Sequence, residues 1–86
     1  MSDVENARAK LGQACQNLDS AGGQVGVALS ELESTKGLLL NAVEGSSQAD
    51  VSEAVGLCTT AESDLETARQ AIFAAKNSAE GVSGRL

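Results

Sequence analysis

Hydrophobic and small residues recur every seven positions through most of this 86-residue chain, and the repeat restricts it to folds built from long packed helices. The first position of each heptad, position a, is always aliphatic; the series is Val4, Leu11, Leu18, Val25, Leu32 and Leu39. Position d, three residues later, is almost always alanine; the series is Ala7, Ala14, Ala21, Ala28, Thr35 and Ala42. Heptads without a change of phase are typical of a helix in a coiled coil.

A second heptad series follows in a new phase. Its a positions are Val51, Cys58, Leu65, Ile72, Ala79 and Leu86, and its d positions are Ala54, Ala61, Ala68, Ala75 and Val82. The phase changes only across residues 44–50, where Gly45-Ser46-Ser47 indicates a turn. The sequence therefore predicts a single all-α domain over 1–86, with helix 1 at about 3–44, a turn at about 45–47 and helix 2 at about 48–80. Gly81 and Gly84 predict a frayed tail over 81–86.

A short turn makes the two helices antiparallel, which determines the residues that meet along the seam between them. Folding the chain about residues 46 and 47 places Leu32 opposite Ala61 and Ala28 opposite Leu65. Nearly every layer then pairs one large residue with one small residue, as close helix packing requires. The predicted fold is a long antiparallel two-helix hairpin, an alanine-rich coiled coil.

Glycines inside the helices leave one alternative open. Gly22-Gly23 is a plausible break in helix 1, and a turn there would give a three-helix bundle. The hairpin is preferred because the heptad phase continues unchanged from Ala21 to Val25 across the two glycines.

The composition argues against several classes of function. The chain has no histidine, so no Ser–His or Cys–His arrangement can form, and we expect a protein that is not an enzyme. Six basic against twelve acidic residues give a formal net charge of −6, which disfavours nucleic-acid and anionic-membrane partners. The longest compact apolar run, 38–40, is too short to span a membrane, and the acidic N-terminus lacks an apolar signal segment. The expected location is the cytoplasm.

Two cysteines and a group of carboxylates are the remaining candidates for chemistry. Cys58 lies at an a position and is expected to act as a small apolar filler, while Cys15 lies beside the seam. The two are too far apart along the predicted hairpin for a disulfide. Acidic residues gather midway along the rod, namely Glu31, Glu33, Glu62, Asp64 and Glu66. Exposed helical carboxylates are usually a solvated surface. We therefore expect no catalytic residue, no cofactor and no metal site.

Near the turn, the apolar surface is wider than a two-helix seam needs. The extra apolar residues outside the a and d series are Leu38, Leu40, Val43, Val55 and Leu57. We expect this surface to bind another helical protein or a second copy, in the simplest case as a homodimer forming a four-helix bundle. The predicted function is protein–protein interaction or scaffolding through helix packing. An amphipathic rod that lies on a lipid surface is an alternative, which the acidity disfavours.

Two short motifs connect this layout to a known family. Val43-Glu44-Gly45 lies at the turn, and Phe73-Ala74-Ala75-Lys76-Asn77 lies in helix 2. The chain resembles the small helical-hairpin Trp-X-Gly secretion substrates of type VII (ESX) systems, which carry Trp-X-Gly at the turn and Tyr-X-X-X-Asp/Glu as an export signal. Here Trp and Tyr are absent, and Asn77 is not acidic. The resemblance implies a bacterial hairpin that pairs into a four-helix bundle and is secreted without a cleaved signal peptide.

Overall fold

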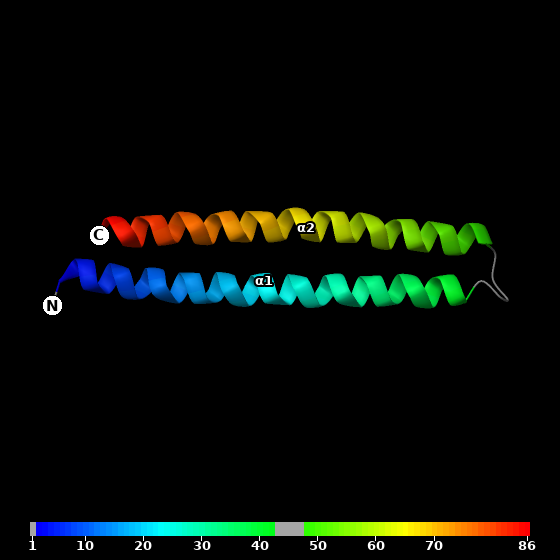
Figure 1. Ribbon diagram of the computed structural model, residues 1–86, viewed down its shortest axis with the longest axis horizontal. Helices are drawn as coiled ribbons and strands as arrows, with labels where there is room; N and C mark the ends of the chain where they lie inside the picture. The colour runs from blue at the N-terminus through cyan, green and yellow to red at the C-terminus, as the bar shows by residue number, and fades with distance from the viewer. Residues whose placement is uncertain (1, 43–47) are drawn as a thin grey trace.

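The computed structural model describes residues 2–42 and 48–86, which form two antiparallel helices lying side by side (Figure 1). Helix α1 spans Asp3–Asn41 and helix α2 spans Gln48–Arg85. The two termini lie together at one end of the molecule, which we call the open end (Figure 1). The predicted all-α hairpin is confirmed.

Local signals account for the ends of α1. Ser2 is the N-cap, because its Oγ accepts a hydrogen bond of 3.2 Å from the Glu5 N–H, and Asp3 and Glu5 place negative charge in the first turn. At the other end, the Ala42 N–H donates to the Leu39 carbonyl at 3.1 Å. The helix thus ends at Asn41, before the predicted residue 44. Residues 43 and 44 and the predicted turn at 45–47 lie outside the described residues.

Helix α2 continues through Gly81 and Gly84 to Arg85, so residues 81–85 are not the frayed tail that the two glycines predicted. Each glycine costs only about 1 kcal/mol of helix stability relative to alanine, which neighbouring turns can offset. Arg85 places positive charge in the last turn, where the helix dipole favours it. The Leu86 N–H donates to the Ser83 carbonyl at 3.2 Å and closes the end.

Helix α1 runs without interruption through Gly22-Gly23, so the three-helix alternative is wrong. Packing explains why the glycines are tolerated at this point. A Cβ built on Gly22 would lie 3.9 Å from Cγ2 of Ile72, so the Ile72 side chain packs over the backbone of α1 there. Small residues of this kind let two helix axes approach closely.

The molecule is a rod with a seam in place of a globular core. Its extents are 67 × 15 × 12 Å, and its radius of gyration is 19.5 Å, against about 12 Å for a compact domain of this length. Among the described residues, only Val51 is buried, with 7% of its surface exposed. The a positions between Leu11 and Leu39 are half-buried rather than buried. Two helices alone shield little from water.

The seam does not follow the a and d positions along its whole length, which corrects the predicted pairing. Three d residues that the heptad pattern placed in the seam, Thr35, Ala68 and Ala75, are exposed. Residues at position e, one residue after d, lie in the seam at these places and are half-buried; they include Lys36, Glu62, Lys76 and Ser83. An α-helix with 3.6 residues per turn drifts by about 20° per heptad relative to a seven-residue repeat. The direction of the shift, from d toward e along both helices, is the one that this drift produces.

Candidate functional site

The seam divides the surface of the rod into two flanks. In an antiparallel pair, the e positions of both helices lie on one side of the seam, and the d and g positions lie on the other. We call the first side the charged flank; its ionic residues are Asp19, Glu33, Lys36, Glu62, Glu66, Arg69 and Lys76. We call the second side the alanine flank, after the residues of its d positions.

Ion pairs connect the two helices on the charged flank. Lys36 Nζ lies 2.6 Å from Glu62 Oε1 across the seam and 3.3 Å from Glu33 Oε2 on its own helix. Nearer the open end, Lys76 Nζ lies 2.8 Å from Asp19 Oδ1. The side chains of Lys36 and Glu62 are only 20% and 17% exposed, so this pair is partly shielded from solvent. The bridges oppose sliding of one helix along the other.

These contacts shift the pKa values of their members. The hydrogen bond to Glu62 is the main cause that raises the pKa of Lys36, and the hydrogen bond from Lys36 in turn lowers the pKa of Glu62. Hydrogen bonding to Asp19 raises the pKa of Lys76. Each shift favours the charged form, as expected for paired opposite charges.

We predict that the pair formed by Lys36 and Glu62 makes stability fall in acid. Because the folded-state pKa of Glu62 is below its ordinary value of 4.5, its contribution is present above that value and is lost as the pH falls through the folded pKa. Glu62→Gln should therefore have a lower melting temperature than the wild type near neutral pH, and the difference between the two melting temperatures should decrease in acid. Thermal melts followed by circular dichroism measure this. Glu53→Gln, an exposed residue, is the control, and an equal shift in both variants would contradict the prediction.

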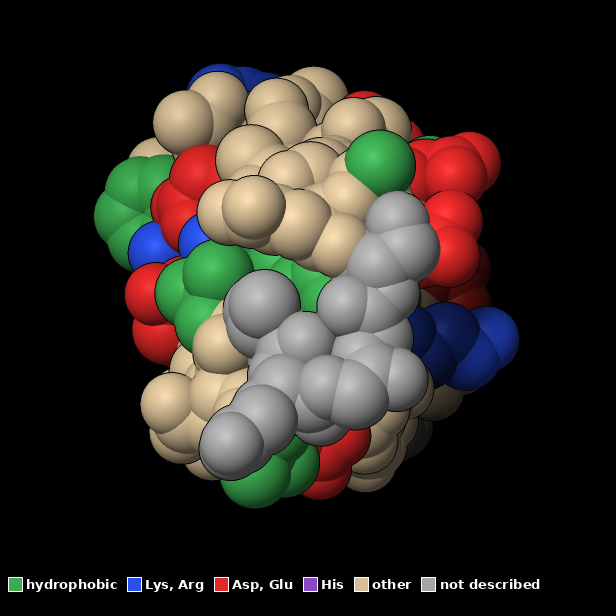
Figure 2. Space-filling model, turned by 90° about the vertical axis from the view of Figure 1, so that its right-hand side faces the viewer, with side chains coloured by type: hydrophobic (Ala, Val, Ile, Leu, Met, Phe, Trp, Pro, Cys, Tyr) green, Lys and Arg blue, Asp and Glu red, His purple; other side chains and the backbone are tan. Residues whose placement is uncertain are grey.

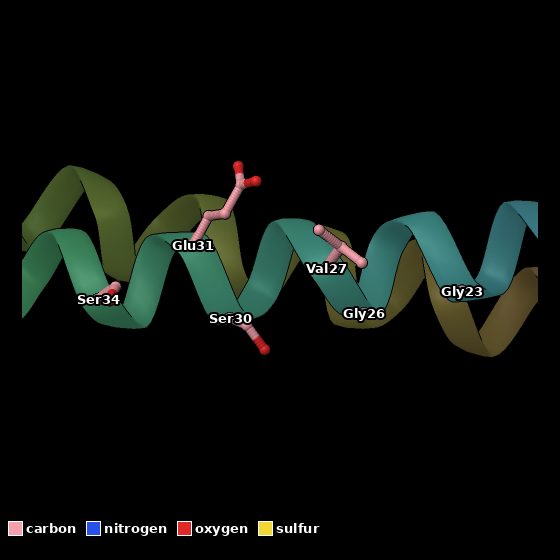
Figure 3. A pocket seen from close by; sticks show the side chains of 6 residues that line it. All are labelled: Gly23, Gly26, Val27, Ser30, Glu31 and Ser34. Atoms are coloured by element: carbon pink, nitrogen blue, oxygen red, sulfur yellow. The ribbon is translucent and has the colours of Figure 1, made fainter.

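Two surface hollows lie on the described part of the rod. One hollow between the helices is lined by Leu18, Asp19, Gly22, Arg69, Ile72, Phe73 and Lys76. Its charged members include Asp19 and Lys76, which already pair with each other. Another is a shallow groove on α1 alone, lined by Gly23, Gly26, Val27, Ser30, Glu31 and Ser34, whose side chains point in different directions (Figure 3).

The carboxylates expected midway along the rod do not converge. Glu62 pairs with Lys36 and Glu66 with Arg69 on the charged flank, whereas Glu31 and Asp64 occupy g positions on the alanine flank. Within 2–42 and 48–86, no group of three or more His, Cys, Asp or Glu side chains could hold a metal ion. Cys15 and Cys58 are free, half-buried thiols.

The structure separates the predicted interface residues. Leu38 and Leu57, 71% and 65% exposed, both occupy g positions on the alanine flank. Leu40 is 59% exposed and Val55 is half-buried, and both lie toward the charged flank. Val43 falls outside the described residues. In the view onto the turn end, hydrophobic side chains reach the surface in several places, and those on the left lie beside acidic and basic side chains (Figure 2).

Two exposed apolar residues were not recognised as such from the sequence: Val27, 60% exposed, was not named, and Phe73, 64% exposed, was named only within the segment that resembles an export signal. Val27 occupies position c and Phe73 position b, so a helical-wheel check of every large apolar residue outside a, d and e would have found both.

Comparison of the chain with protein-family models, curated proteins and solved structures found no match. In the described parts of the chain, neither helix is long and apolar enough to cross a membrane.

Proposed function

We propose that this chain is a protein–protein interaction module that acts through helix packing and whose simplest partner is a second copy of itself. The observation that carries the proposal is that the apolar repeat runs along both helices while the hairpin buries very few of its apolar side chains. Only Val51 is buried among the described residues, while Leu38, Leu40 and Leu57 are each more than half exposed. A second hairpin packed against the first would form a four-helix bundle and cover such side chains.

Magnitudes support this proposal. Burying a leucine fully stabilises a complex by about 1.5–3 kcal/mol, so a few exposed leucines can offset much of the cost of association. An isolated hairpin, by contrast, has to fold with a half-buried seam and several helical glycines. A two-fold pair is the commonest closed assembly among soluble homo-oligomers.

We predict that Leu38→Glu combined with Leu57→Glu weakens self-association. A carboxylate at a position that the second hairpin covers would have to lose its hydration, which is strongly unfavourable. Light scattering after size-exclusion chromatography measures the mass, and circular dichroism melts at several concentrations measure the linked stability. Phe73→Glu is the matched control, since Phe73 is 64% exposed, close to Leu57 at 65%, but occupies a b position toward the charged flank. A wild type that stays monomeric and fully helical at high concentration, with an unshifted melt in the double variant, would contradict the proposal.

A second candidate function is secretion as a type VII substrate-like hairpin. The specific observation in its favour is Phe73, an aromatic side chain that is 64% exposed on α2 within the segment that resembles the export signal. An exposed aromatic residue is available to a recognition partner. Detection of the chain in culture supernatant of intact cells, lost when the secretion system is deleted, would support this function, and retention inside the cells would contradict it.

A further inference from the structure

The chain exposes more surface than a folded monomer of its size normally does. Its accessible surface is 5870 Å², whereas monomers of 8.7 kDa average about 4,700 Å². The excess of roughly 1,100 Å² compares with about 800 Å² that each partner buries in a standard protein–protein interface. One additional copy of the rod, packed along its length, would therefore bring the exposed surface into the usual range.

The alanine flank suits such a contact better than the charged flank does. All eleven d positions are uncharged, being alanine except for Thr35 and Val82, so burying them removes no charge from water. Toward the open end, Ala68, Ala75 and Val82 are exposed although they continue the heptad pattern. The charged flank would have to lose the hydration of its ion pairs on burial, which is costly.

The register between the helices places like charges together on the alanine flank. Lys76 lies at the height of Asp19, as their ion pair shows. Nine residues further toward the open end, Arg85 reaches the height of Lys10, so two basic residues occupy g positions at one height; we call them the basic pair.

Twelve residues from the same ion pair in the opposite direction, Asp64 reaches the height of Glu31, so two acidic residues occupy g positions at one height; we call them the acidic pair. Among the described residues, Lys10, Glu31, Asp64 and Arg85 are all exposed, and none of them has an ion-pair partner.

We propose that a second copy of this chain docks on the alanine flank in the opposite direction, about a two-fold axis at the height of Ala21 and Ala75. This inference rests on the proposed function and names the face and orientation of the contact. Ala21 lies midway between Lys10 and Glu31 along α1, and Ala75 midway between Asp64 and Arg85 along α2. The two-fold therefore brings the basic pair of each hairpin against the acidic pair of the other.

Alanine at the axis allows the closest approach of the facing helices. In this arrangement α1 faces the α1 of the second copy, so Ala21 meets its own counterpart and Ala14 meets Ala28. Two hairpins that ran in the same direction would instead bring acidic pairs together and basic pairs together. Charge complementarity selects the orientation, because unfavourable like-charge contacts suppress the alternative.

Charge reversal tests both the face and the orientation. Glu31→Lys with Asp64→Lys lowers the magnitude of the net charge from −6 to −2, since each replacement adds two units of charge. Less overall repulsion should tighten any non-specific association. In the proposed dimer, however, the new lysines face Lys10 and Arg85, so the dissociation constant should rise by about tenfold or more at low ionic strength. Adding Lys10→Glu with Arg85→Glu to the same chain should restore the wild-type value.

Sedimentation velocity over a concentration series measures the dissociation constants, and circular dichroism verifies that the variants stay helical. As a second measurement, Ala21→Cys in a Cys15→Ser, Cys58→Ser background should form a disulfide-linked dimer on mild oxidation, because the two-fold places the thiols face to face. Ala42→Cys in that background should not, since the two residues 42 would lie roughly 60 Å apart at helical rise.

If the wild type dimerises and Glu31→Lys with Asp64→Lys leaves the dissociation constant unchanged or lowers it, the inference is overturned but the proposed function is not. Cross-linking between Ala42→Cys chains and Ala54→Cys chains, which face each other only when the hairpins run in the same direction, would also overturn the inference alone. A wild type that remains monomeric overturns both, and light scattering on the wild type by itself identifies that case.

Discussion

Replacing Ile72 by alanine is expected to lower the free energy of unfolding by about 2 kcal/mol, a large share of the stability of a small domain. Ile72 is a half-buried a residue of α2, and its Cγ2 lies over the backbone of α1 at Gly22. Gly22 has no side chain of its own that could move into the space. Truncation therefore leaves a gap in the seam. Replacing a fully buried isoleucine by alanine costs about 2–5 kcal/mol, and because Ile72 is only half-buried, we expect a loss at the lower end of this range.

Phe73→Ala is the matched control for this substitution. Phe73 is the next residue and has a larger side chain, but 64% of its surface is exposed, so its removal should change stability far less. Urea unfolding followed by circular dichroism, at a concentration where the assembly state of both variants is known, measures the two effects. A Phe73→Ala variant that is destabilised as much as Ile72→Ala would mean that the seam does not run through Ile72.

The hairpin was predictable because its signals are local and repeated. Six a positions mark each helix, the phase change across residues 44–50 separates the two helices, and Ser2 marks the start of α1. The side-by-side packing then follows from a short connection. Gly22-Gly23 and Gly81 were the ambiguous points, since helix propensity alone does not decide between a break and a tolerated glycine.

The charged flank could not be derived from the seven-residue repeat. A heptad analysis assigns the seam to a and d, and the drift of an α-helix with 3.6 residues per turn moves it toward e. Lys36 and Glu62 consequently approach each other across the seam, whereas the heptad pattern assigned their neighbours Thr35 and Ala61 to two separate layers of the seam. Pairing between side chains on different helices depends on this axial and angular register, which single-helix patterns do not contain.

The candidate interface was partly predictable for the same reason. An excess of apolar residues near the turn was visible in the sequence, but their division between flanks was not. Leu38 and Leu57 share the alanine flank because both are g residues at one height in the antiparallel register, whereas Leu40 lies toward the charged flank. Apolar character alone does not establish that Leu38, Leu40, Val55 and Leu57 belong to one surface.

Replacing Ala28 by leucine is expected to destabilise the hairpin by about 1–3 kcal/mol, although leucine is the better buried hydrophobe. Ala28 is half-buried at a d position of α1, in a seam where small residues set the distance between the helix axes. The added atoms have to force the axes apart or adopt a poor rotamer. Both responses also weaken packing at the neighbouring layers, so the cost exceeds the gain from the added apolar surface.

Ala74→Leu is the matched control, because Ala74 is exposed on α2 at position c and the same chemical change there should shift stability by less than about 0.5 kcal/mol. Thermal melts of both variants measure the difference, and light scattering on each sample shows whether the added leucine changes the assembly. If Ala28→Leu unfolds at the wild-type temperature with an unchanged mass, small residues do not set the spacing of this seam. If it unfolds earlier while Ala74→Leu does not, the alanines at the d positions are required for their size, which is the property that a close contact between hairpins also needs.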